Sequence, residues 1–142
     1  MHLPSTKQLR YLVALDDHKH FGQAAAAFVE RLRALPGEVW VPSHGSYPWL
    51  AGKPFRVASD PLLDLVYSGY PAFPDDLERD LRAGRFSSVL LDGPLPEPRL
   101  ARALEAGYGR PAELSDAPAT RVMYRTAPRL LYRPKEARAD PR

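Results

Sequence analysis

The 142-residue sequence contains no cysteine, which excludes a disulfide framework, a thiolate zinc site and a cysteine nucleophile. It has no apolar run that approaches the roughly 20 residues needed to cross a bilayer. No apolar core precedes the Asp16-Asp17 pair, so a signal peptide is not expected either. The sequence as written therefore predicts a cytoplasmic protein without a transmembrane segment.

The chain also lacks a concentration of charge of either sign. Its net charge is +3, and the last ten residues, RPKEARADPR, carry four basic and two acidic side chains, which is +2 of that total. Nucleic-acid binding needs clustered cations that displace counterions from phosphates. No nucleic-acid partner is therefore expected, and residues 135–142 are predicted to form a disordered basic tail.

The sequence does contain many apolar runs, and prolines mostly stand between them. The 16 prolines, about twice the usual share, fall mostly between apolar runs and mark loops there. Helices are expected over residues 5–18, 23–35, 60–66, 74–84 and 97–106, and strands over 38–41, 55–58 and 86–91. This pattern predicts an α/β fold: a small three-layer domain with a mainly parallel sheet, preceded by two N-terminal helices.

The end of the chain adds two further strand candidates. The runs RVMYR (121–125) and RLLYR (129–133) flank Thr126-Ala127-Pro128 and favour a hairpin or a pair of edge strands. We divide the chain into an N-terminal helical segment (1–35), an α/β domain (36–134) and the tail (135–142).

Residues 3–27, LPSTKQLRYLVALDDHKHFGQAAAA, resemble the N-terminal start of LysR-type transcription regulators. In that family this start leads through a turn into a recognition helix that enters the major groove. Here Phe28-Val29-Glu30-Arg31-Leu32 follows Ala27 directly, so the second helix is expected to continue and the recognition helix is missing. The resemblance implies an incomplete helix-turn-helix without assigned DNA-binding residues. A DNA-binding regulator fragment is kept as an alternative function.

Residues 29–134 resemble another family. They contain PGEVWVPSHGSYPWLAGKP, FSSVLLDGP and PRLLYRP in that order, as in the soluble C-terminal domain of bacterial polytopic membrane glycosyltransferases that use lipid-linked sugar donors. The resemblance implies a non-catalytic accessory domain, extracytoplasmic at the inner membrane in the parent enzymes, where the membrane part catalyses transfer. It implies as partners that membrane portion, a sugar or a lipid-linked sugar. On its own the domain is not expected to transfer sugar.

Five residues make up the candidate ligand site: His44, Tyr47, Trp49, Lys53 and Asp92. Most lie on the loop expected after the first strand, where α/β folds place ligand sites. The two aromatic rings could stack on a sugar, and the aspartate at a strand end could accept hydrogen bonds from hydroxyls. The alternative is that these residues cap the loop and fill the space between loop and sheet.

No catalytic residue, metal ligand or cofactor is assigned. Ser43 and His44 are adjacent and cannot form a nucleophile–base pair, and no G-x-S-x-G elbow is present. The segment GSYPWLAGKP is not a P-loop, because Pro54 stands where a hydroxyl should reach magnesium. A second alternative is a small sugar-binding or hydrolytic α/β protein that uses the loops of His44, Tyr47 and Asp92.

Overall fold

The computed structural model describes residues 22–54, 68, 75–115, 117, 120–122 and 124–136. The helices expected over 5–18 and 60–66 and the strand expected over 55–58 lie outside these residues, as do positions 137–142 of the expected tail. In the part of the chain that is described, no helix is long and apolar enough to span a membrane.

The main sheet has four strands in the order β1-β2-β6-β3. Their bounds are β1 Val39–Trp40, β2 Ser88–Leu91, β3 Ala112–Glu113 and β6 Leu130–Tyr132. β1 and β2 are parallel, whereas β6 is antiparallel to both of its neighbours. The fold is α/β, but the sheet is mixed and the expectation of a mainly parallel sheet is wrong.

The reversed strand has a simple topological cause. β1, β2 and β3 run in one direction, because β3 and β2 are each antiparallel to β6. Helix α5, Pro98–Gly107, lies between β2 and β3 and returns the chain, as a parallel crossover requires. Between β3 and β6 the described residues form no helix but a separate two-stranded sheet within residues 120–126, and the chain enters β6 in the opposite direction.

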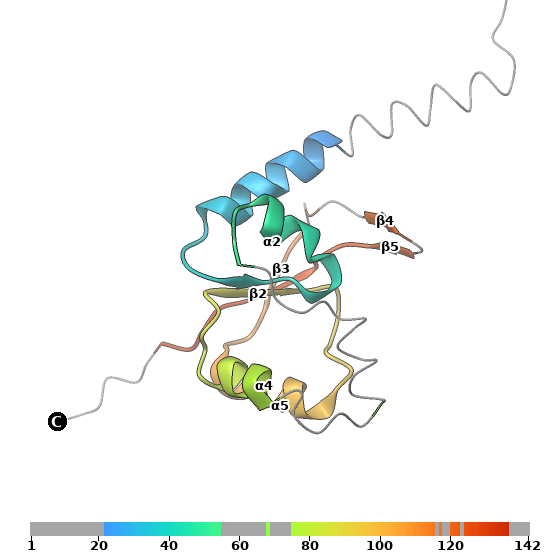
Figure 1. The fold of residues 1–142 in the computed structure, drawn as a ribbon. Helices are drawn as coiled ribbons and strands as arrows, with labels where there is room; N and C mark the ends of the chain where they lie inside the picture. The colour runs from blue at the N-terminus through green and yellow to red at the C-terminus, as the bar shows by residue number, and fades with distance from the viewer. Residues whose placement is uncertain are drawn as a thin grey trace, which may run out of the picture.

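Helices cover both faces of the sheet (Figure 1). The helix over 22–34 contributes Phe28, Val29 and Leu32 to a core with Val39, Val41, Tyr47, Ala51 and Leu90. Alternate residues of the same strands, Trp40, Val89 and Leu91, face α4 (Asp75–Arg82) and α5. The alternation follows from strand geometry, because successive side chains point to opposite faces. The helix over 22–34 is therefore part of the core of the α/β domain.

Two helices agree with their sequence signals. α4 has Asp75, Asp76 and Glu78 in its first turn and Arg79 and Arg82 in its last, which complements the helix dipole. At the start of α5, the Glu97 carboxylate accepts a hydrogen bond of 2.7 Å from the backbone N–H of Leu100, and Pro98 occupies the first turn. The helices expected over 74–84 and 97–106 are confirmed.

Two other expectations are wrong. The loop expected after the first strand, residues 42–53, instead contains a short helix η1, Pro42–His44, and α2, Ser46–Leu50. The hairpin or pair of edge strands expected from 121–125 and 129–133 is not formed as such: β4, Thr120–Val122, pairs with β5, Tyr124–Thr126, in a two-stranded sheet, and β6 is an inner strand of the main sheet. Residues 130–132 join the main sheet instead, where Arg129 N–H donates to the Leu91 carbonyl at 2.9 Å.

At Gly107 the end of α5 lies close against the backbone of α4. A Cβ atom at this position would lie 2.0 Å from the Leu81 carbonyl oxygen, so no side chain fits there. The Gly107 carbonyl also accepts a hydrogen bond of 3.0 Å from the backbone N–H of Lys135, the first residue of the expected tail. This glycine fixes the distance between the two helices and the sheet edge behind them.

Tyr108 follows Gly107, and its side-chain hydroxyl binds the backbone of Phe86, the residue two positions before β2. Its hydroxyl donates to the Phe86 carbonyl at 2.9 Å and accepts from the Phe86 N–H at 3.0 Å. Both residues are buried. Burial raises the pKa of Tyr108 to about 12. A side chain thus satisfies the backbone polar groups of the residue that leads into β2.

We predict that Gly107→Ala lowers the free energy of unfolding by about 1–3 kcal/mol, because the added methyl group forces α4 and α5 apart. Gly109→Ala is the matched control, since the nearest heavy atom to its added Cβ is 3.9 Å away. Urea denaturation of both variants measures the difference. Equal stability of the two variants would show that the helix pair adjusts without cost.

We predict that stability falls as the pH rises from 10 toward 12, because the unfolded state loses the Tyr108 proton near pH 10 while the folded state retains it. Tyr108→Phe should remove the contribution of this residue to the slope. The same variant should cost about 1–3 kcal/mol at neutral pH, because the Phe86 backbone loses its two hydrogen bonds to the Tyr108 hydroxyl. Urea denaturation at several pH values tests both effects; an unchanged slope in the variant would contradict the assignment.

Candidate functional site

The centre of the candidate site is a hydrogen-bonded pair formed by His44 and Asp92. His44 lies on η1, which follows β1, and Asp92 directly follows β2. Because β1 and β2 are parallel neighbours, their carboxyl ends meet at one edge of the sheet. There the His44 Nε2 atom lies 2.9 and 2.8 Å from the Oδ1 and Oδ2 atoms of Asp92. Two residues that are 48 positions apart in the sequence are thus joined.

The two partners differ in exposure. The side chain of His44 is 2% exposed and that of Asp92 is 19% exposed. A carboxylate only accepts hydrogen bonds, so the geometry requires Nε2 of His44 to carry the proton that it donates. The imidazole lies behind the carboxylate and holds it in place. Asp92 is therefore the member of the pair that a dissolved molecule can reach.

Tyr47 lies beside this pair but within the core. The centroid of its ring is 5.9 Å from that of His44. The ring also makes an edge contact with Phe28, with 5.2 Å between the two centroids. Burial raises the pKa of the Tyr47 phenol. Among the described residues, the phenolic oxygen has no hydrogen-bond partner. A buried hydroxyl without a partner is uncommon, since it forfeits its hydrogen bonds with water.

The structure does not place Trp49 and Lys53 with the pair. Trp49 is 66% exposed. It lies two residues after buried Tyr47 in α2, so its side chain points to the other side of the helix. The Lys53 ammonium donates to the Leu35 carbonyl, just beyond the helix over 22–34, where a cation is favourable for the helix dipole. Of the five residues proposed from sequence, the structure brings together His44, Tyr47 and Asp92.

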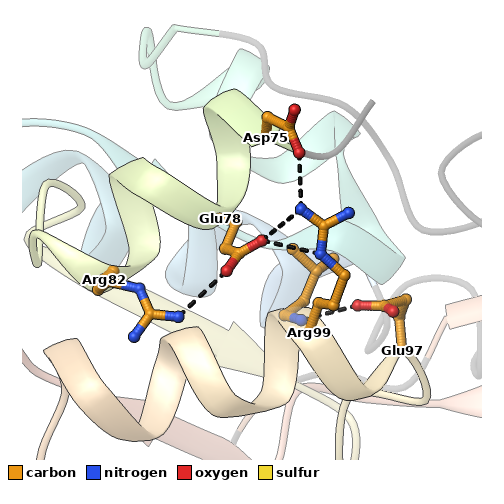
Figure 2. A network of polar contacts seen from close by, with 6 residues as sticks. Asp75, Glu78, Arg82, Glu97 and Arg99 are labelled. Atoms are coloured by element: carbon orange, nitrogen blue, oxygen red, sulfur yellow. Dashed lines mark hydrogen bonds and ion pairs between the residues drawn. The ribbon is translucent and has the colours of Figure 1, made fainter. Parts of the chain in front are cut away.

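A polar cluster that the sequence analysis did not identify connects α4 and α5 (Figure 2). The Arg99 guanidinium donates to Glu78 Oε2 at 2.9 and 2.7 Å and to Asp75 Oδ1 at 2.6 Å. Glu78 also accepts from Arg82 at 3.1 Å. The bonds from Arg82 and Arg99 lower the pKa of Glu78, and those to Asp75 and Glu78 raise the pKa of Arg99. The Glu78–Arg82 pair is visible in the sequence as an i,i+4 spacing, but the contact with Arg99 depends on helix packing.

The outer face of α4 forms an open hollow of about 490 Å³. Its lining residues are Asp75, Glu78, Arg79, Arg82 and Ala83. Each charged side chain of this surface has an ion-pair partner. Glu78 pairs with Arg82 within it, and the other charges pair with Arg99 or Asp76 just outside it. Such exposed pairs contribute little to stability individually and present no unmatched charge to a ligand. We regard the cluster as a connection between helices.

The chemistry of the described residues does not form a known catalytic arrangement. No group of three or more histidine, cysteine, aspartate or glutamate residues is arranged to hold a metal ion among the residues with described positions. In a pair that activates a nucleophile, the imidazole faces the substrate and the carboxylate lies behind it. Here the order is reversed, because His44 is the buried member. The site fits hydrogen-bond acceptance better than proton abstraction by histidine.

We predict that Asp92→Asn lowers the free energy of unfolding by about 1–3 kcal/mol, because the buried imidazole of His44 loses its charged acceptor. Glu113→Gln removes an exposed carboxylate in β3 and should change stability by less than about 0.5 kcal/mol. Thermal and urea denaturation provide the measurement. A neutral effect of Asp92→Asn would show that the pair does not hold η1 to the sheet.

Comparison with protein-family models, with curated proteins and with solved structures finds no match to this chain. The resemblances to LysR-type regulators and to membrane glycosyltransferases therefore depend on the motif residues alone.

Proposed function

We propose that this chain is a small three-layer α/β accessory domain of a membrane glycosyltransferase that uses lipid-linked sugar donors, and that the domain has no catalytic activity of its own. One observation carries the proposal. The segments that contain PSHGSYPWLAGKP and FSSVLLDGP include η1 and β2, and the His44–Asp92 hydrogen bonds join them at the carboxyl edge of the sheet. Residues that define the motifs thus have a common physical role.

The burial of His44 supports the non-catalytic part of the proposal. An imidazole that is 2% exposed and bonded to a carboxylate has no surface with which to contact a donor or an acceptor. Proton transfer requires hydrogen-bond reach between the catalytic group and the reacting atom. In this proposal the pair fixes the shape of one sheet edge, and sugar transfer belongs to the membrane part of the parent enzyme.

A domain exchange tests the proposal. The C-terminal soluble domain of a membrane glycosyltransferase of the resembling type is replaced by residues 22–136 of this chain, and sugar transfer from a polyprenyl-phosphate donor is measured in membranes. We expect the exchanged enzyme to retain transfer that the enzyme without any C-terminal domain lacks. The purified chain alone should show no transfer and no hydrolysis of aryl glycosides. Equal inactivity of the exchanged and truncated enzymes would overturn the proposal.

The second candidate, a small sugar-binding or hydrolytic protein, is favoured by the 19% exposure of Asp92 at the carboxyl edge. The aryl glycoside assay distinguishes it from the first. Turnover by the purified chain that Asp92→Asn abolishes and Glu113→Gln preserves would favour the hydrolytic function over the accessory function.

A further inference from the structure

We propose that Asp92, held in place by His44, is the acceptor of a binding site for two adjacent hydroxyl groups, such as the vicinal diol of a pyranose sugar. The inference deepens the proposed accessory function and rests on it for the choice of a sugar as ligand. The site itself is argued from the carboxylate and its surroundings.

The first step concerns the free capacity of the carboxylate. The two oxygens of an ionised aspartate offer about four lone-pair positions in total. The N–H of His44 is shared between both oxygens, at 2.9 and 2.8 Å, so each oxygen keeps capacity for another donor. The 19% exposure of the side chain shows that solvent reaches this group. A rigid pair of acceptors side by side matches two neighbouring hydroxyl donors.

The second step concerns which ligand chemistry fits. An anionic group such as a phosphate is repelled by the carboxylate, and the imidazole behind it is already used in the pair. A metal ion requires several ligands, and the described residues contain no group of three or more suitable side chains. Hydrogen-bond donors remain, and the sugar of the proposed function supplies them as neutral hydroxyl groups. They are also the donors for which a carboxylate gives a strong, charge-assisted hydrogen bond.

The third step concerns access and neighbouring polar groups. Gly93 follows Asp92, and a Cβ atom added there would meet no heavy atom within 4 Å apart from its chain neighbours, so a side chain has room at the position next to Asp92. Behind His44 lies Tyr47, a buried phenol whose oxygen has no partner among the described residues.

The experiment titrates the ¹⁵N-labelled full chain with methyl α-D-mannopyranoside, which carries a vicinal diol, and follows the backbone amide signals by NMR. Cyclohexanol, with one hydroxyl on a ring of the same size, is the matched ligand control. We expect saturable shifts at Gly45, Asp92 and Gly93 with the glycoside and none with cyclohexanol. Asp92→Asn should weaken binding at least about 10-fold, which corresponds to about 1.4 kcal/mol, and Glu113→Gln should leave it unchanged.

Gly93→Leu is a second variant that does not remove the His44–Asp92 pair. Its side chain has space and should block the carboxylate, so we expect weaker binding in a chain with an unchanged fold. Binding that survives both variants, the same shifts with cyclohexanol, or no saturable shift would overturn the inference. Repeating the titration with a polyprenyl-phosphate mannose in detergent distinguishes a lipid-linked sugar from a free one.

The outcomes separate this inference from the proposed function. If the chain binds no sugar but the exchanged enzyme is active, the diol site is refuted and the accessory function stands. If the chain binds sugar but the exchanged enzyme is inactive, the accessory function is refuted and the diol site stands. Sugar binding with turnover by the chain alone assigns Asp92 to a hydrolytic protein.

Discussion

Strand β2 is buried on both faces, and the described part of the molecule is organised around this constraint. Ser88, Val89, Leu90 and Leu91 are each at most 3% exposed. A strand of this kind requires an apolar layer on each side, which the helix over 22–34 and the α4–α5 pair supply. It also needs a hydrogen-bonding neighbour along each edge, and β1 and β6 provide these. The close approach at Gly107 and the Arg99 contacts serve this arrangement, because they fix the helix pair that covers one face.

The position of Asp92 follows from the same constraint. The residue after the last buried position of β2 emerges at the edge where the parallel strand β1 also ends. A carboxylate at such a place must face water or find a donor, because an unpaired buried charge is costly. Asp92 does both, through its partial exposure and its bonds to His44. The pair is thus a consequence of strand topology as much as of local sequence.

The sequence predicted those elements whose signals are local. FSSVLL indicated β2, and the helix over 97–106, with Leu100 and Leu104 on one face and Gly107 at its end, indicated α5. The predicted candidate site comprised His44, Tyr47, Trp49, Lys53 and Asp92, because they follow expected strands, and the structure brings only His44, Tyr47 and Asp92 together. The direction of β6, the pairing of β4 with β5 and the contacts of Arg99 depend on chain segments that meet only after folding. Residues 42–53 were mistaken for a loop because Pro42, Pro48 and several glycines outweighed two very short helices.

The reversed direction of β6 limits what the carboxyl edge can bind. A parallel sheet of the expected kind opens a crevice where the strand order reverses, and nucleotides bind there. In this fold β6 begins at the edge where β2 ends, with Leu130 opposite Leu91 and the Arg129 N–H bonded to the Leu91 carbonyl. The buried residue Pro128 precedes it. Asp92 therefore lies between η1 on one side and the entry to β6 on the other. For the site proposed above, this position favours a ligand that presents a small group of hydroxyls over a nucleotide laid along the sheet edge.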